Sequence, residues 1–332
     1  MPALDDHPLR YTLNSELHAR PFPSLAAPHV AAYLAVRPLG EAARRDRSVD
    51  LQQLRDLLAH YGAPLPAEDA THYFGPMGKY TLKWEQHTEF VTYTVFLDQL
   101  GQRPFDPAEF DVFPQDWRAG LNAQRITSIL LRLVPRPPQD AQIAETLQDW
   151  FVPESLAVAS VLEDAAVIAS DFRIDPAGHM RMAVFASEGT GSRRLGRIVQ
   201  RLCEIETYKS MSMLGFAKVR EFAGQLDRID AELNDLMAGM AGTSAMAEDT
   251  LHRLLDISVG LEALSADASY RLGATEAYQA IVAQRIGALR ETRFMARQGF
   301  DEFMMRRYEP VMRTVTSSET RLNKMSARAS RA

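Results

Sequence analysis

Two short stretches place acidic and imidazole side chains at alternate positions, a spacing that could support metal binding or proton transfer. The six residues are Glu16, His18 and Arg20 in the stretch ELHAR, and Glu85, His87 and Glu89 in the stretch WEQHTEF. Alternate residues of an extended strand point to the same face, so each trio could act as a group. Carboxylate and imidazole groups bind divalent metals and also act as general acids and bases. A sharper hypothesis is that the two trios converge on one site.

Each trio also has a purely structural interpretation. The stretch WEQHTEF fits the polar tip of a β-hairpin, because strand-like apolar residues stand on both sides of it. The stretch ELHAR fits a brief N-terminal turn in which Glu16 and Arg20 form salt bridges, since Pro21 disfavours helical geometry at Arg20. The spacing of the residues is compatible with either interpretation, and both stay open at this point.

A glycine-containing stretch, EGTGSRRLG, leads into a long helical pattern and is a candidate anion-binding loop. Its candidate residues are Gly189, Gly191, Ser192, Arg193 and Arg194. Free N–H groups at a helix N-terminus can bind phosphate, but the glycine spacing does not match the dinucleotide-binding fingerprint. The alternative is a plain connection in which Thr190 or Ser192 caps the helix. The motifs GxxxxGK[ST], HExxH and GxSxG are absent, and no cofactor is predicted.

Residues 1–188 are predicted to form an α+β domain built on a mixed β-sheet with packed helices. Strand-like runs and short helical runs follow one another between about His29 and Ser187, separated by prolines and glycines. The order strand, helix and three strands occurs twice, once before Gly101 and once after Gln115. This repetition indicates a possible duplication of one strand–helix–strands unit within an α+β layered fold.

Residues 192–332 are predicted to form a stalk of long antiparallel helices packed as a coiled coil. Apolar residues recur every three or four positions. One such row consists of Leu195, Ile198, Leu202 and Ile205, and another of Phe222, Leu226, Ile229, Leu233, Leu236 and Met240. Residues 241–249 predict a break, and later helices are expected at about 251–268 and 270–310. A last apolar row from Val311 is still in phase where the sequence stops, so truncation before a further segment is expected.

The composition fits a folded protein with two domains and gives no reason to expect nucleic acid binding. The chain has 332 residues, of which 46% are hydrophobic, and a net charge of −6. Its only cysteine, Cys203, excludes an intrachain disulfide and a CxxC metal site. Residues 290–332 contain 10 Lys and Arg against 5 Asp and Glu, so this segment is +5 and the remainder is −11. Such a basic end either faces anionic lipid or forms a solvated helix face.

Three stretches together resemble one protein family. LNSELHARPFP, KWEQHTEFVTYTVF and VQRLCEIETYKSMSMLG occur here in the order typical of the domain of unknown function 3422 family, described as uncharacterised membrane-anchored bacterial proteins. The resemblance implies a location on the cytoplasmic face of the inner membrane, with the anchor in a C-terminal segment absent from this sequence. It implies no activity. The layout is also similar to magnesium channels of the CorA kind, as an analogy of architecture.

Two functional hypotheses follow from these patterns. The first is a non-enzymatic, membrane-anchored scaffold, sensor or transport-associated module whose copies associate through the helical region. The second is a metal-dependent enzyme or ligand sensor that uses the two trios of ionisable residues. Both trios lining one open pocket would favour the second hypothesis.

Overall fold

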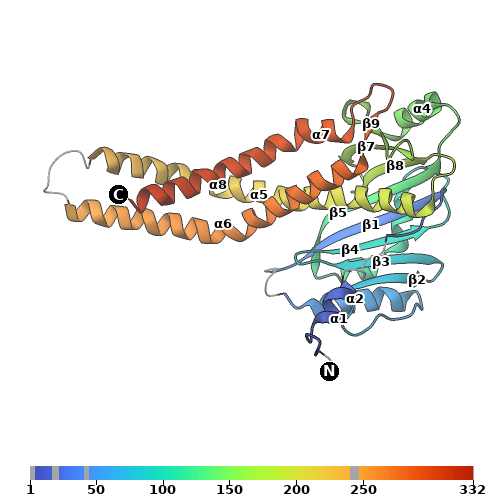
Figure 1. Ribbon diagram of the computed structural model, residues 1–332, viewed down its shortest axis with the longest axis horizontal. Coiled ribbons are helices and arrows are strands. Elements are labelled where there is room, and N and C mark those ends of the chain that lie inside the picture. The colour runs from blue at the N-terminus through green and yellow to red at the C-terminus, as the bar shows by residue number, and fades with distance from the viewer. Residues whose placement is uncertain (1–3, 17–21, 41–44, 240–246, 332) are drawn as a thin grey trace. The chain divides into compact units, whose positions relative to one another are not determined.

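The protein consists of two compact units (Figure 1). The computed structural model describes residues 4–16, 22–40, 45–239 and 247–331. The sheet unit consists of Met1–Thr207 and Leu289–Phe300, and the helical unit consists of Tyr208–Ala288 and Asp301–Ala332. Helix α5 (Ser192–Gly239) contributes residues to both units.

The described part of the sheet unit contains a nine-stranded mixed sheet with the order β2-β3-β4-β1-β5-β8-β7-β6-β9. The strands are β1 (His29–Pro38), β2 (His72–Met77), β3 (Tyr80–Gln86), β4 (Val91–Leu97), β5 (Ala123–Pro135), β6 (Ala157–Val161), β7 (Ala166–Ile174), β8 (Met180–Ala186) and β9 (Thr292–Arg293). Strands β5 and β8 pair in parallel, and the other neighbouring strands pair antiparallel. The helical segments of this unit are α1 (Arg10–Glu16), α2 (Arg47–His60), η2 (Pro107–Val112), α3 (Gln115–Ala119), α4 (Asp140–Trp150) and η3 (Pro153–Ser155).

The predicted repetition of strand, helix and three strands is present in the order of the elements. The first half runs β1, α2, β2, β3, β4, and the second runs β5, α4, β6, β7, β8. In each half the first strand pairs with the last strand, antiparallel in the first half and parallel in the second. The two halves therefore share their order of elements but differ in the direction of this strand pair.

Both faces of the central strands are buried, which explains why β1 is apolar at nearly every position. Ala32, Leu34 and Val36 of β1 point to one face, where they pack with leucines of α2 and with Ile143 and Leu147 of α4. Alternate residues point to the opposite face. There the Tyr33 hydroxyl lies 2.7 Å from Thr207 Oγ1 of α5, so the first turns of α5 cover this second face.

The helical unit contains the rest of α5, helix α6 (Ala247–Leu289), and helices α7 (Phe300–Arg307) and α8 (Glu309–Ala329). Helices α5 and α6 are antiparallel, because Lys218 pairs with Asp267 at 2.7 Å while Ile229, later on α5, contacts Gly260, earlier on α6. Helix α8 runs parallel to α5. Arg321 pairs with Asp230 at 2.7 Å, and Arg328 donates to Asn234 at 2.8 Å.

The buried apolar rows agree with much of the predicted helical pattern. Phe222, Leu226, Ile229, Leu233 and Leu236 are all buried on α5, whereas Met240 lies outside the described residues. Val315, Leu322 and Met325 are buried on α8. The predicted break near residue 269 is wrong, because α6 is one continuous helix with a buried row that includes Leu264, Ala268 and Leu272. The predicted continuous helix at about 270–310 is also wrong, because α6 ends at Leu289 and β9 follows before α7 begins at Phe300.

The α+β class, the mixed sheet and the long helices are therefore confirmed. One part of the predicted stalk has another role: the row from Leu195 to Ile205 is buried within the sheet unit, since α5 belongs to that unit as far as Thr207. The coiled-coil geometry, the domain limits 1–188 and 192–332, and the truncation stay predictions.

Candidate functional site

The trio Glu85, His87 and Glu89 lies at the turn between β3 and β4. Glu85 is in β3, which ends at Gln86, so His87 and Glu89 follow the strand instead of continuing it. The His87 N–H donates to the Phe90 carbonyl at 2.9 Å, and the two rings stack with centroids 4.4 Å apart. Glu89 is 2% exposed. The hairpin thus places the three side chains in different backbone settings instead of on one strand face.

The second trio is only partly within the described residues. Glu16 ends α1, whereas His18 and Arg20 lie outside the described residues. The convergence of the two trios on one site therefore stays a prediction. Within the part of the chain that the structure describes, no three His, Cys, Asp or Glu side chains lie close enough to hold a metal ion.

The candidate anion loop connects β8 to α5. Gly189 has a φ of +76°, which glycine adopts at low cost, and the Thr190 hydroxyl donates to the Ala165 carbonyl at 2.8 Å. Arg194 pairs with Glu163 at 3.2 Å. The hydroxyl of Ser192 lies 2.7 Å from that of Ser24. Gly191 and Arg193 complete the loop and are exposed. Its described polar contacts are thus contacts within the sheet unit, and anion binding there stays a prediction.

A segment just after the ELHAR stretch is fixed against the start of α5. The Leu25 N–H donates to the Ser192 carbonyl at 3.1 Å, and Pro23 and Leu25 are buried. Gly196, one turn further along α5, lies so close to the Pro23 backbone that a Cβ atom there would overlap the Pro23 carbonyl group. The glycine therefore permits close approach of segment 22–25 to the helix.

A row of polar side chains, buried at Lys83 and half-buried at Glu85, Gln200 and Glu204, connects the β3 stretch to α5, and sequence reasoning missed it. The Lys83 ammonium lies 3.1 Å from the Glu85 carboxylate and donates to Gln200 Oε1 at 2.7 Å. Gln200 in turn donates to Glu204 at 2.7 Å. Lys83 is 4% exposed. Burying an ion pair costs desolvation energy that the pair's attraction must offset, so this row is an unusual feature of the second sheet face.

Two spacings in the sequence agree with this row of polar side chains. Lys83 and Glu85 are two apart on a strand, which places them on one face, and Gln200 and Glu204 are four apart on a helix, which does the same. The sequence does not show that this strand and this helix, more than a hundred residues apart, pack against each other. Cys203, next to the row, is buried; burial raises the pKa of its thiol, which therefore stays neutral.

A second buried polar group lies on the other face at the end of β3. The Asp50 carboxylate of α2 accepts a hydrogen bond from Gln86 at 2.8 Å and pairs with Arg45 at 3.0 Å. Burial raises the pKa of Asp50, although Arg45 and the Gln86 hydrogen bond act in the opposite direction. Polar contacts therefore fix the end of β3 from both faces.

The sheet unit also contains a cavity of about 510 Å³ beside the β4–η2 connection. Its lining includes Lys79, Asp98 and Glu109. Glu109 accepts a hydrogen bond from the Gly101 N–H at 3.1 Å and lies 3.6 Å from Arg132. Burial raises the pKa of Glu109. The carboxylate thus holds the connection in place at the wall of the cavity.

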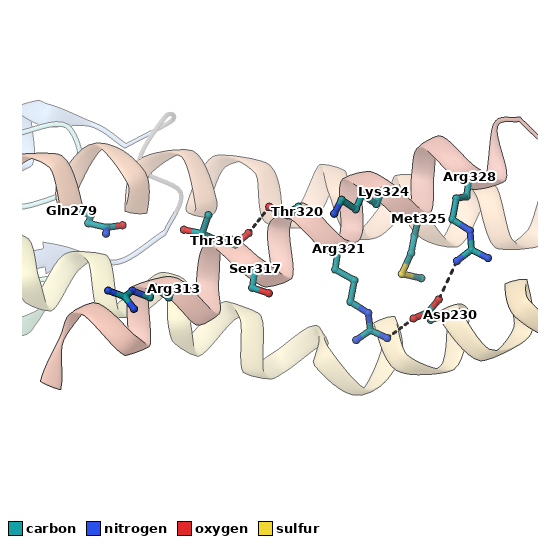
Figure 2. Close-up of a pocket in the computed structure, with 10 residues that line it drawn as sticks. All are labelled: Asp230, Gln279, Arg313, Thr316, Ser317, Thr320, Arg321, Lys324, Met325 and Arg328. Atoms are coloured by element: carbon teal, nitrogen blue, oxygen red, sulfur yellow. Dashed lines mark hydrogen bonds and ion pairs between the residues drawn. The ribbon is translucent and has the colours of Figure 1, made fainter. Parts of the chain in front are cut away.

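The helical unit contains a longer groove of about 640 Å³, shown in Figure 2. Eight of the lining residues come from α8, with Asp230 from α5 and Gln279 from α6. The α8 residues are Arg313, Thr316, Ser317, Thr320, Arg321, Lys324, Met325 and Arg328. The Arg313–Arg328 span corresponds to about 22 Å at 1.5 Å per residue.

Positive charge in this groove is only partly neutralised. Asp230 forms ion pairs with both Arg321, at 2.7 Å, and Arg328, at 3.7 Å. Arg313 and Lys324 have no acidic partner within ion-pair distance among the described residues, and both line the groove (Figure 2). The groove is therefore suited to a negatively charged partner.

The fold and these sites define an α+β protein whose sheet unit has a buried polar row and whose helical unit has a cationic groove. The chain belongs to the family described as "Protein of unknown function (DUF3422)", whose sequence model matches residues 5–332. Comparisons with curated proteins and with solved structures found no match. No helix within the described ranges is both long enough and apolar enough to cross a bilayer.

Proposed function

We propose that this protein is a non-enzymatic scaffold that acts at the cytoplasmic face of the inner membrane and binds a negatively charged partner in the groove of its helical unit. The observation that carries the proposal is the pair of groove cations, Arg313 and Lys324, that lack acidic partners among the described residues. The membrane location is supported by the resemblance of three motif stretches to membrane-anchored proteins.

The sheet unit supports a binding role because its most buried ionisable pairs form structural contacts. Lys83 pairs with Glu85 and donates a hydrogen bond to Gln200. Asp50 pairs with Arg45 and accepts a hydrogen bond from Gln86. The CorA-like layout is an analogy of architecture, and a transport-associated role belongs to the proposal only as one use of such a scaffold.

A ligand sensor or metal-dependent enzyme is the second candidate, and the buried polar row favours it. Buried ion pairs seldom increase stability over apolar packing, so a row such as Lys83, Glu85 and Gln200 can be retained for function. The test is thermal unfolding of the purified chain with added Zn²⁺ or Mg²⁺. A metal-dependent rise in the unfolding temperature that His87→Ala abolishes would support this candidate over the scaffold.

The scaffold is tested by fractionating the native cell and measuring the size of the extracted assembly. The wild-type protein is expected in the membrane pellet and, after detergent extraction, in an assembly larger than one chain. Arg313→Gln combined with Lys324→Gln removes both unneutralised groove charges, so it should reduce the assembly size while leaving the protein in the membrane pellet.

The matched control is Arg228→Gln combined with Arg253→Gln, which removes the same charge from exposed positions of α5 and α6 outside the groove. This control should leave the assembly unchanged. Wild-type protein found only in the soluble fraction would contradict the membrane location. Equal effects of the groove and control variants would contradict partner binding in the groove.

A further inference from the structure

Helix α6 exposes an apolar surface on the side opposite its buried face. Leu251, Leu255 and Val259 are 56%, 53% and 69% exposed, whereas Ile257 and Leu261, on the α5 side, are 4% and 1% exposed. Residues four apart are neighbours on a helix surface, so Leu251, Leu255 and Val259 form one ridge, named the α6 ridge. Contiguous exposed apolar surface of this kind marks an interaction site.

Acidic residues flank the α6 ridge at both ends. Glu248 precedes Leu251 by three positions and Glu262 follows Val259 by three, so both lie on the side of the ridge. Both are exposed, and neither forms an ion pair with another described residue. At 1.5 Å per residue the two glutamates are about 21 Å apart along the helix. An anionic lipid surface would repel this ridge, whereas a cationic groove would attract it.

The cationic groove along α8 matches the α6 ridge in length, charge and surface character. Its length of about 22 Å is that of the ridge with its two glutamates. Met325 is 2% exposed at the groove floor, and the aliphatic stems of Arg313 and Lys324 add apolar surface. The two cations without described acidic partners are about 17 Å apart along α8, about 4 Å less than the spacing of Glu248 and Glu262, and the long Arg and Lys side chains can span that difference.

Both surfaces lie at the same height along the helical unit. Ile229 of α5 contacts Gly260 of α6, and the neighbouring Asp230 pairs with Arg321 of α8. Gly260 lies on α6 directly after Val259 of the ridge, and Arg321 lines the groove. A two-fold axis across the helices at about this height makes the two copies antiparallel, so that the ridge of each faces the groove of the other.

We propose that the partner of the groove is a second copy of this chain, whose α6 ridge inserts between the groove cations. This self-association names the partner of the proposed scaffold. Only its biological use rests on the scaffold function; the contact between two copies does not. Leu251, Leu255 and Val259 then face the apolar floor. Because the two copies are antiparallel, Glu248 approaches Arg313 and Glu262 approaches Lys324. Charge complementarity of this kind fixes partner choice and register.

The test is sedimentation of the purified chain over a range of concentrations. The wild type is expected to contain at least two chains. Leu255→Asp places a charge in the middle of the ridge and should weaken association by about 30-fold or more, as for a central interface residue. Glu262→Lys and Lys324→Glu should each weaken association by roughly three- to tenfold. Their combination in one chain should recover much of the loss, because the charges again match.

Two controls make the outcome decisive. Glu276→Lys makes the same charge change at an exposed position of α6 outside the ridge and should leave association unchanged. Far-UV circular dichroism shows that each variant keeps its helices. A monomeric wild type, or equal effects of Glu262→Lys and Glu276→Lys, would overturn the inference. A monomeric purified chain whose native membrane assembly still depends on Arg313 and Lys324 would overturn only this inference and leave the scaffold standing.

Discussion

Replacing Gly196 by alanine should release the segment that follows the ELHAR stretch from helix α5. A Cβ atom at position 196 would lie 2.6 Å from the Pro23 carbonyl carbon and closer still to its oxygen. Carbon atoms in contact are normally about 3.5–4.0 Å apart and the carbonyl oxygen is closer still, so the segment must retreat by more than about 1 Å. The hydrogen bonds of Ser24 and Leu25 to Ser192 cannot survive such a shift with good geometry.

The expected loss of stability is about 2–4 kcal/mol. Two hydrogen bonds contribute about 1 kcal/mol each, and partial exposure of Leu25 forfeits part of the roughly 1.5–3 kcal/mol of its burial. Against this, alanine in place of glycine within a helix stabilises by about 1 kcal/mol. For a unit of about 200 residues, this loss lowers the unfolding temperature by roughly 5–15 °C.

Tryptophan fluorescence during urea unfolding measures this effect in the correct unit. The three tryptophans, Trp84, Trp117 and Trp150, all lie in the sheet unit. The control is Gly191→Ala, at a loop position where a Cβ would meet no atom within 4 Å, and it should change stability by less than about 0.5 kcal/mol. If Gly196→Ala is as stable as the wild type, the reasoning about the docked segment is refuted.

Three further changes test the helical unit and the buried polar row. Gly215→Ala places a Cβ 2.8 Å from the Thr275 Cβ atom and closer still to its hydroxyl, so it should destabilise by about 1–3 kcal/mol. Gly224→Ala, in open space on the same helix, should stabilise by about 0.5–1 kcal/mol. Stability changes of the same sign for both variants in thermal circular dichroism would contradict the α5–α6 packing. Lys83→Met should cost about 3 kcal/mol in urea unfolding because it leaves the Glu85 carboxylate, which is only 13% exposed, without its cation. A gain in stability would show that the row is not held by this pair. Burial raises the pKa of Tyr308 to about 12, against about 10 in the unfolded chain. The unfolded form therefore loses the proton first, and the free energy of unfolding falls as the pH rises from about 10 to 12. Denaturation curves of Tyr308→Phe should lack that part of the fall, and a variant with the same pH profile as the wild type would contradict this role of Tyr308.

The strands and helices could be predicted largely because apolar side chains recur at different intervals in the two structures, every second residue in a half-buried strand and every third or fourth in a helix. The strand-like runs HVAAYLAVRP and RITSILLRLVP became β1 and most of β5, and the helical pattern from Ser192 became α5. The expected break near residue 269 was wrong because a serine does not end a helix when its hydroxyl bonds within it, as Ser269 does to the Ala266 carbonyl at 3.4 Å.

What a helical row packs against could not be predicted from its spacing. The row beginning at Leu195 has the spacing of a coiled coil, yet it is buried in the sheet unit, because a helix presents the same stripe to a sheet as to another helix. For the same reason the Lys83–Gln200 contact was not foreseen. Each residue was visible on its own element, but the pairing of distant elements depends on the whole fold.

The most direct test of the self-association claim is a cross-link between two differently tagged copies. One copy carries Val259→Cys on the α6 ridge and the other carries Ser317→Cys in the groove, and the only native thiol, Cys203, is buried. We expect a short bifunctional thiol reagent to join the two tags, and to join them far less when the first copy carries Glu276→Cys instead. No mixed product from the ridge and groove pair, or an equal yield from the control pair, would contradict the claim that one chain's α6 ridge occupies another chain's groove.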